Sequence, residues 1–147
     1  MLFVDPGANI GMALFGTLGK QFCLVRVRAF SDWMDSEVKK MNILVELNTD
    51  KVVCERPTYM GPTAAQSNAL TKLSMSAGAV WGMCLAKGVQ FEWLDVKTWK
   101  GQLPKRVVHE RVLKLLSPRE NMIVSGVSNE HVLDAVGMGL YYTGRMK

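Results

Sequence analysis

The strongest constraint on the fold is a series of three β-strand patterns within the first 30 residues. An apolar run at residues 2–4 ends at Asp5-Pro6-Gly7, where the proline and glycine interrupt a strand. Residues 11–16 and 21–29 form two further strand candidates. Connections this short join antiparallel neighbours, because a parallel pair needs a crossover of about a dozen residues or more. The chain is therefore predicted to begin with three antiparallel strands.

Helices and strands alternate after this point. A helix capped by Ser31 is predicted, because Met34, Val38, Met41 and Val45 follow at helical spacing. The later elements predicted are a strand at 52–54, a long helix at about 63–86, a strand at 89–93, a basic helix opened by Pro104, a polar loop at 117–127 and a last helix at about 129–143, capped by Ser128. This order predicts an α/β fold: a mixed five-stranded sheet, three antiparallel strands then two parallel ones, flanked by helices.

Length and composition fit one compact unit. The chain has 147 residues, 48% hydrophobic and 21% charged, so residues 1–147 are expected to form a single domain without long disordered tracts. No apolar run approaches the roughly 18 residues of a membrane span. The N-terminus reaches Asp5 too soon for a secretory signal. A cytoplasmic protein without a membrane partner is expected.

Basic residues are concentrated in one segment. The net charge is +5 and the pI about 9.2, which favours a polyanionic partner. Between residues 97 and 114 there is one acid, Glu110, and the basic residues are Lys97, Lys100, Lys105, Arg106, Arg111 and Lys114. This excess indicates a surface that faces phosphates, and the alternative is a solvated helix face.

Two acids stand at strand ends. Asp5 closes the first strand and Glu55 closes the fourth. In a mixed sheet these strands can lie side by side and parallel, which brings both carboxylates to one edge. A divalent cation would relieve their repulsion, and oxygen ligands suit Mg²⁺ or Mn²⁺. The alternatives are that Asp5 is only a turn residue and that Glu55 pairs with Arg56 or Arg28.

The last helix supplies further candidate ligands. His131 and Asp134 are three residues apart and share a helix face. The small residues Ala135, Gly137 and Gly139 would let this helix approach the sheet closely. The alternative is a solvated first turn that complements the helix dipole. Taken with the strand order, the four candidates together favour a metal centre.

These residues resemble the motifs of the RuvC family of Holliday-junction resolvases, within the RNase H-like nucleases. The segments that carry the resemblance are Phe3-Val4-Asp5-Pro6-Gly7 with Gly11-Met12-Ala13, Val53-Cys54-Glu55-Arg56-Pro57, His131 to Gly137, and the basic positions Val96-Lys97 and Lys105. The resemblance runs from residue 3 to about 142 and is nearest to compact, phage-type members. His131 stands where many members have an acid, and the stretch between Lys97 and Lys105 is shorter than usual.

The resemblance implies phosphodiester hydrolysis with two divalent ions, Mg²⁺ or Mn²⁺, in each active site. Asp5 would bridge both ions, and Glu55 and Asp134 would each bind one or both. His131 would bind a metal or assist proton transfer. Lys105 would stabilise charge on the phosphate. Backbone phosphates of DNA would be held by Lys97, Lys100, Lys105 and Arg106.

The implied partner is branched DNA, the four-way junction above all, in DNA recombination and repair. A homodimer would place two active sites on opposed strands. Its candidate interface is the long helix at about 63–86, which carries Trp81, and the alternative is an ordinary core helix. Tyr59 would act as a wedge at the junction centre, or be an ordinary loop aromatic.

Two other functions remain open. A YqgF-like RNA-processing nuclease would also carry Asp-Pro-Gly and a late aspartate, but the basic helix and Glu55-Arg56-Pro57 favour the resolvase. A non-catalytic protein that binds branched DNA would have a decayed site, whereas all four candidate ligands are present.

Overall fold

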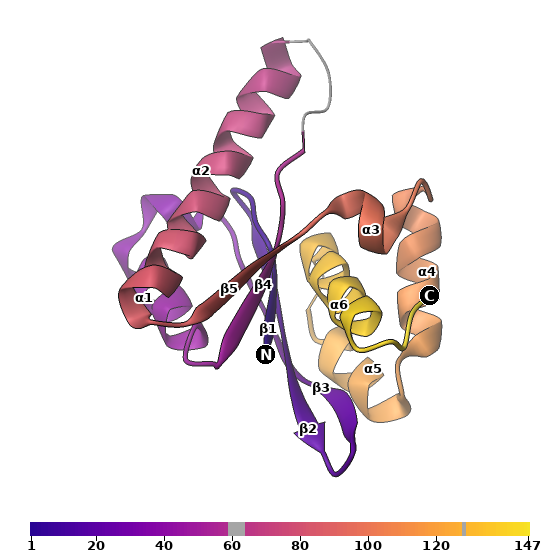
Figure 1. Ribbon diagram of the computed structural model, residues 1–147. Coiled ribbons are helices and arrows are strands. Elements are labelled where there is room, and N and C mark those ends of the chain that lie inside the picture. The colour runs from indigo at the N-terminus through magenta and orange to yellow at the C-terminus, as the bar shows by residue number, and fades with distance from the viewer. Residues whose placement is uncertain (59–63, 128) are drawn as a thin grey trace.

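The computed structural model describes residues 1–58, 64–127 and 129–147 and places five strands in one sheet (Figure 1). The strands are β1 (Leu2–Asp5), β2 (Ile10–Leu18), β3 (Gln21–Phe30), β4 (Lys51–Glu55) and β5 (Gln90–Leu94). Their order across the sheet is β3-β2-β1-β4-β5. Pairing is antiparallel among the first three strands, whereas β4 is parallel to both β1 and β5. The predicted mixed sheet is confirmed.

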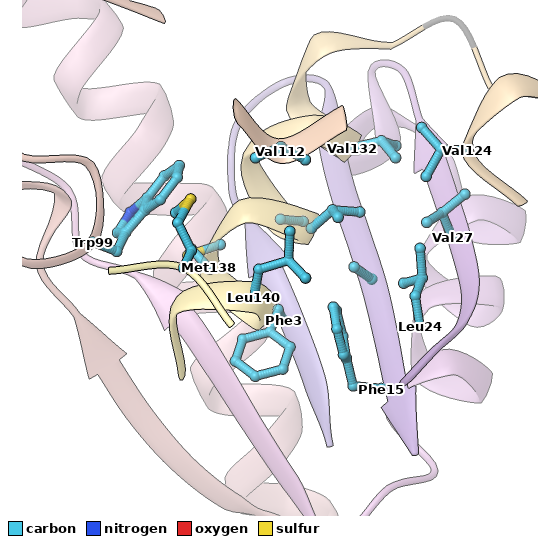
Figure 2. Packing of buried hydrophobic residues seen from close by; sticks show 14 of the residues in the cluster. Phe3, Phe15, Leu24, Val27, Trp99, Val112, Val124, Val132, Met138 and Leu140 are labelled. Atoms are coloured by element: carbon cyan, nitrogen blue, oxygen red, sulfur yellow. The ribbon is translucent and has the colours of Figure 1, made fainter. Parts of the chain in front are cut away.

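Helices cover both faces of this sheet. They are η1 (Trp33–Asp35, a 3₁₀ turn), α1 (Glu37–Glu46), α2 (Ala64–Lys87), α3 (Val96–Lys100), α4 (Lys105–Leu115), α5 (Pro118–Ser125) and α6 (Glu130–Tyr142). Residues of η1, α1 and α2 share one hydrophobic cluster with the sheet. Residues of α3 to α6 share the other cluster (Figure 2). Among the described residues, no helix is both long and apolar enough to cross a bilayer.

The alternation of side chains along β1 and β4 decides which way the acids point. Phe3 and Val53 belong to the cluster beneath α6, and their chain neighbours belong to the cluster beneath α1 and α2. Successive residues of a strand point to opposite faces. Asp5 and Glu55, each two residues further on, therefore point to the same side as Phe3 and Val53, toward α3 and α6.

Glycines allow α6 to lie directly on the sheet. A Cβ atom at Gly11 of β2 would be 2.2 Å from the backbone carbonyl of His131, and one at Gly139 would be 2.1 Å from the Phe15 ring. At Gly137 it would be 2.7 Å from Trp99. The close approach expected for the small residues of this helix is present, and Gly11 provides the space on the strand.

The first helix differs from its prediction. Its cap is Ser36, not Ser31, because the 3₁₀ turn η1 intervenes and buries Trp33 completely. The buried face of α1 and its end is formed by Ile43 and Leu47. Three of the four residues whose spacing predicts the helix are 60–70% exposed: Val38, Met41 and Val45.

The prediction of a polar loop at 117–127 is wrong, because α5 occupies most of this segment. Ser117 and Glu120 form a capping box: the Ser117 hydroxyl accepts a hydrogen bond from the Glu120 backbone N–H, and the Glu120 carboxylate accepts one from the Ser117 N–H. Pro118 occupies the first turn, where its missing N–H has no cost. Glu120 is buried and also pairs with Arg145 at 2.6 Å.

Candidate active site

Asp5 and Glu55 lie at the same end of two adjacent strands. Residues Leu2 to Val4 of β1 pair in parallel with Val52 to Cys54 of β4. The next position of each strand holds an acid, so the carboxylates emerge side by side, as the sequence predicts. Asp5 is 5% exposed and Glu55 is partly buried.

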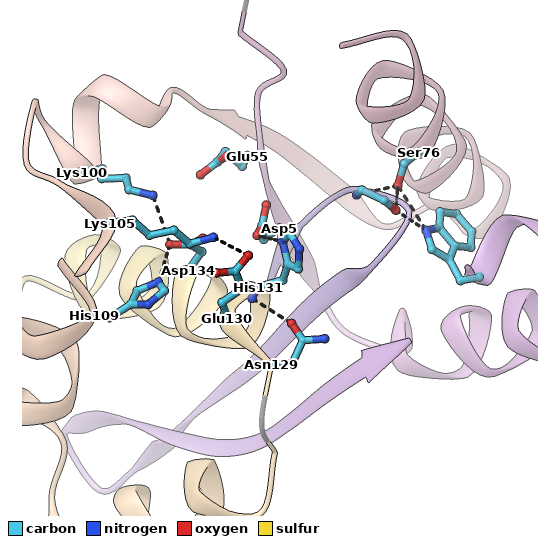
Figure 3. A network of polar contacts seen from close by, with 12 residues as sticks. Asp5, Glu55, Ser76, Lys100, Lys105, His109, Asn129, Glu130, His131 and Asp134 are labelled. Carbon is cyan, nitrogen blue, oxygen red and sulfur yellow. Dashed lines mark hydrogen bonds and ion pairs between the residues drawn. The ribbon is translucent and has the colours of Figure 1, made fainter. Parts of the chain in front are cut away.

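Helix α6 brings its N-terminal turn against Asp5. Asn129 caps the helix, since its side-chain oxygen accepts a hydrogen bond of 2.9 Å from the His131 backbone N–H. Nδ1 of His131 lies 2.8 Å from Oδ2 of Asp5 (Figure 3). The cap predicted at Ser128 lies outside the described residues. The contact between His131 and Asp5 joins the two ends of the chain at the edge of the sheet.

Asp134, one turn further along α6, is surrounded by basic side chains (Figure 3). Its Oδ1 lies 3.3 Å from Nζ of Lys100 and 3.0 Å from Nε2 of His109, and its Oδ2 lies 3.1 Å from Nζ of Lys105. Lys105 also pairs with Glu130 at 3.2 Å. Helices α3 and α4 therefore place positive charge directly beside the acids.

Glu55 is oriented by a neighbour that the sequence does not single out. The indole Nε1 of Trp99, in α3, donates a hydrogen bond of 3.1 Å to Oε2 of Glu55. Neither arginine considered in the alternative contacts this carboxylate in the described part of the chain. Arg56 pairs with Asp95 at 3.2 Å and Arg28 pairs with Glu46 at 3.3 Å.

Negative charge is crowded at this edge of the sheet. Burial, together with the nearby carboxylates of Asp5 and Asp134, raises the pKa of Glu55 to about 7. Burial also raises the pKa of Asp5, although the hydrogen bond from His131 opposes this rise. A carboxylate that resists ionisation beside two others is in a place where a cation would be stabilised.

The basic residues compensate part of this charge. Burial alone would raise the pKa of Asp134, but Lys100 and Lys105 outweigh it and lower the pKa. The hydrogen bond to Asp5 raises the pKa of His131. Of the three carboxylates at this site, Asp134 is the one whose pKa is lowered, and Asp5 favours the protonated form of His131.

The donor set fits a hard divalent cation in its chemistry. Asp5, Glu55 and Asp134 offer carboxylate oxygens, which Mg²⁺ and Mn²⁺ prefer, and His131 offers a ring nitrogen. Within the described ranges, no three His, Cys, Asp or Glu side chains are close enough together to hold one ion as they lie. Their present partners are His131 for Asp5, Trp99 for Glu55, and two lysines and His109 for Asp134, so binding an ion would require exchanging some of these contacts.

Of the residues predicted to contact DNA, some lie beside the acids and others do not. Lys100 and Lys105 reach the acids, whereas Lys97 on α3 is exposed to solvent. Arg106 is 85% exposed and pairs with Glu110 at 3.3 Å on the outer face of α4. Tyr59 lies outside the described residues.

Sequence reasoning missed His109. Its side chain is 15% exposed and contacts Asp134. One signal was available, because His109 falls four residues after Lys105 and so shares its face of α4. Nothing local in the sequence shows that this face meets α6.

No protein-family model matches this chain, and no curated protein matches it in sequence. Solved structures do match. The chain is similar to Thermus thermophilus RuvC in complex with a Holliday-junction substrate, with a TM-score of 0.69 and 18% identity over 100% of this chain and 98% of that one. It is similar to the fowlpox virus Holliday-junction resolvase, with a TM-score of 0.68 and 17% identity over 99% of this chain and 98% of that one. The complex of the fowlpox resolvase with Holliday-junction DNA gives a TM-score of 0.65 at 17% identity, over 99% of both chains. The RNase H-like fold of RuvC-like proteins is thereby shown.

Proposed function

We propose that this protein is a divalent-metal-dependent endonuclease that cleaves four-way and other branched DNA. One observation carries the proposal: Asp5, Glu55 and Asp134 meet at one edge of the sheet, with Lys100 and Lys105 beside them. Acids that would bind metal, next to lysines that would bind phosphate, are the two parts needed to hydrolyse a phosphodiester. Similarity in fold to proteins solved in complex with a Holliday junction supports the choice of substrate.

Asp5, Glu55, Asp134 and His131 are the residues that would hold the metal. Two divalent ions would supply a water molecule of lowered pKa and neutralise charge at the scissile phosphate. The raised pKa of Glu55 supports this assignment, because buried carboxylates without a cation are costly to ionise.

Two side chains are suited to act on the substrate itself. Lys105 is 38% exposed, so its ammonium group can reach from Asp134 toward a phosphate and stabilise developing negative charge. His131 uses Nδ1 on Asp5, which leaves Nε2 available as a ligand or for proton transfer. The side chain of His131 is 28% exposed and therefore accessible.

DNA would be held by its backbone. Lys97 and Arg106 are exposed on α3 and α4, on either side of Lys100 and Lys105 in the sequence. Contacts of this kind give affinity that falls with salt and carry little base specificity. The structure of the junction, rather than its sequence, would then select the substrate.

A homodimer would match the two-fold character of a four-way junction. The outer side of α2 exposes large apolar side chains, and so does α1: Met75, Trp81 and Leu85 are 47–61% exposed, and Val38, Met41 and Val45 are 60–70% exposed. Lys87 of α2 donates a hydrogen bond of 2.9 Å to the Leu44 carbonyl, which ties the two helices together. Apolar surface of this kind is typical of an interface between proteins.

A cleavage assay tests the proposal. The purified protein is incubated with a synthetic four-way DNA junction, a linear duplex of the same sequences and a structured RNA, each with Mg²⁺, with Mn²⁺ and with EDTA. Metal-dependent nicking of the junction in preference to the duplex is expected. Preferential cutting of the RNA would favour an RNA-processing enzyme, and junction binding without nicking would favour a non-catalytic binder; either result would overturn the proposal.

A further inference from the structure

The loop that follows Asp5 is held by two buried side chains from the opposite face of the sheet. The Ser76 hydroxyl, on α2, accepts a hydrogen bond of 3.0 Å from the Gly7 backbone N–H and donates one of 3.0 Å to the Gly7 carbonyl (Figure 3). The Trp33 Nε1–H donates to the same carbonyl at 2.9 Å and to the Ser76 oxygen at 3.2 Å.

Every hydrogen-bonding position of the Ser76 hydroxyl is used. A hydroxyl has one proton to donate and two lone pairs to accept with, and all three are engaged here. Both Ser76 and Trp33 are 0% exposed, so neither side chain contacts solvent. The two side chains and the backbone N–H and C=O of Gly7 form a closed network.

The Ser76 hydroxyl donates its hydrogen bond outside its own helix. A serine in a helix commonly donates to a carbonyl of the preceding turn. Ser125 of α5 does so, donating a hydrogen bond of 3.0 Å to the Met122 carbonyl. Ser76 instead reaches a residue 69 positions away in the chain. Its hydroxyl is directed at the β1–β2 loop.

This loop connects two parts of the candidate site. Gly7 lies two residues after Asp5 and four before Gly11, against which the His131 backbone packs. Asp5 points toward α6, whereas Ser76 and Trp33 hold the loop from the side of α1 and α2. The loop is therefore fixed between the two helical layers.

We propose that Ser76 and Trp33 are positioning residues, which clamp the backbone of Gly7 and so hold Asp5 where it completes the metal site. This inference rests on the proposed function, in which Asp5 is a metal ligand. Neither residue touches the reacting groups. Losing a partner that orients a ligand typically lowers metal affinity or activity by about 10- to 100-fold. An effect near the lower end is expected here, because the clamp acts on backbone next to the ligand.

Two variants test the clamp. Ser76→Ala removes all three hydrogen bonds of the hydroxyl, and Trp33→Phe removes the indole N–H while keeping an aromatic ring in the core. Ser125→Ala is the control, because it deletes a helical serine hydroxyl whose hydrogen bond, in the described part of the chain, stays within its own helix. Folding is checked by circular dichroism. If Ser76→Ala does not fold, the clamp is judged on Trp33→Phe.

Three readouts are compared on the full chain. The first is Mn²⁺ affinity without DNA, by calorimetry. The second is the Mn²⁺ concentration that gives half-maximal nicking of a four-way junction. The third is hydrogen exchange of the Gly7 amide, by NMR. Both clamp variants are expected to weaken Mn²⁺ binding about tenfold, to raise the half-maximal concentration similarly and to speed Gly7 exchange, while junction binding in EDTA and the control stay at wild-type values.

Folded clamp variants with wild-type Mn²⁺ affinity and half-maximal concentration would overturn the clamp, and the proposed function would stand if the wild type still nicks junctions. If the wild type fails to nick junctions but the clamp variants weaken its Mn²⁺ binding, the proposed function fails and the clamp stands. No Mn²⁺ binding by the wild type would overturn both.

Discussion

Nδ1 of His131 lies 2.8 Å from Oδ2 of Asp5, although 126 positions separate the two residues in the chain. This contact brings the C-terminal helix onto the end of the first strand. Asp134 follows one turn later on the same helix and pairs with Lys100 of α3 and Lys105 of α4. The candidate site is therefore assembled only when the whole chain has folded.

The packing behind this contact can be tested at Gly11. A Cβ atom there would lie 2.2 Å from the His131 carbonyl, so Gly11→Ala must push α6 away from β2. We expect a loss of about 1–3 kcal/mol in the free energy of unfolding and a marked loss of nicking. Urea unfolding measures the first effect. Gly126→Ala is the control, because nothing lies within 4 Å of its added Cβ; equal stability of the two variants would contradict the account.

Lys105 is predicted to act on DNA. Lys105→Ala should lower the single-turnover rate of junction nicking and reduce the slope of log affinity against log salt by about one. Lys20→Ala, in the β2–β3 turn, is the control for loss of a positive charge elsewhere. If the two variants have the same rate and the same salt slope as the wild type, Lys105 does not contact the substrate.

His109 is predicted to orient Asp134. Its Nε2 is 3.0 Å from Oδ1 of that carboxylate, and its side chain is largely buried. His109→Ala should reduce nicking about tenfold, as expected for loss of a partner that holds a ligand, with little change in junction affinity measured in EDTA. A rate equal to that of the wild type would show that the lysines hold Asp134 without it.

Glu120 should make stability depend on acid pH. Its hydrogen bonds with Arg145, the largest cause, lower the pKa of Glu120 to about 2 from an ordinary 4.5. The unfolded chain therefore binds this proton more readily, so the stabilisation is complete above about pH 4.5 and is lost as the pH falls toward 2. Glu120→Gln should cost about 3 kcal/mol at pH 7 and flatten the pH dependence within that window. Unfolding midpoints from pH 2 to 7 measure it, and parallel curves for both proteins would contradict the assignment.

The meeting of Asp5 and Glu55 could be predicted because it depends on local pattern. Each acid ends an apolar strand, and a parallel pair of strands places such ends together. His131 and Asp134 were likewise readable from their spacing on one helix. The contacts of Trp99 with Glu55 and of His109 with Asp134 could not be predicted. Both residues reach the site only because α3 and α4 pack against α6.

The two wrong predictions about the fold, for the first helix and for residues 117–127, have physical causes. The apolar spacing of Val38, Met41 and Val45 is helical, but these side chains face solvent because α1 packs on the core through its other side, with Ile43 and Leu47. The α5 segment is too polar to suggest a helix by hydrophobic pattern. The Ser117-x-x-Glu120 capping box is visible in the sequence and indicates the start of this helix.

The metal centre is tested most directly by conservative changes to its two strand-end acids. Asp5→Asn and Glu55→Gln keep the shape of each side chain and remove the charge that would hold a cation. Single-turnover nicking of a four-way DNA junction in Mg²⁺ is measured for both, with junction affinity in EDTA measured in parallel. Glu37→Gln, an exposed change on α1, is the control. The account predicts that both site variants lose about 100-fold or more in rate while they still bind the junction; a wild-type rate in either variant would contradict it.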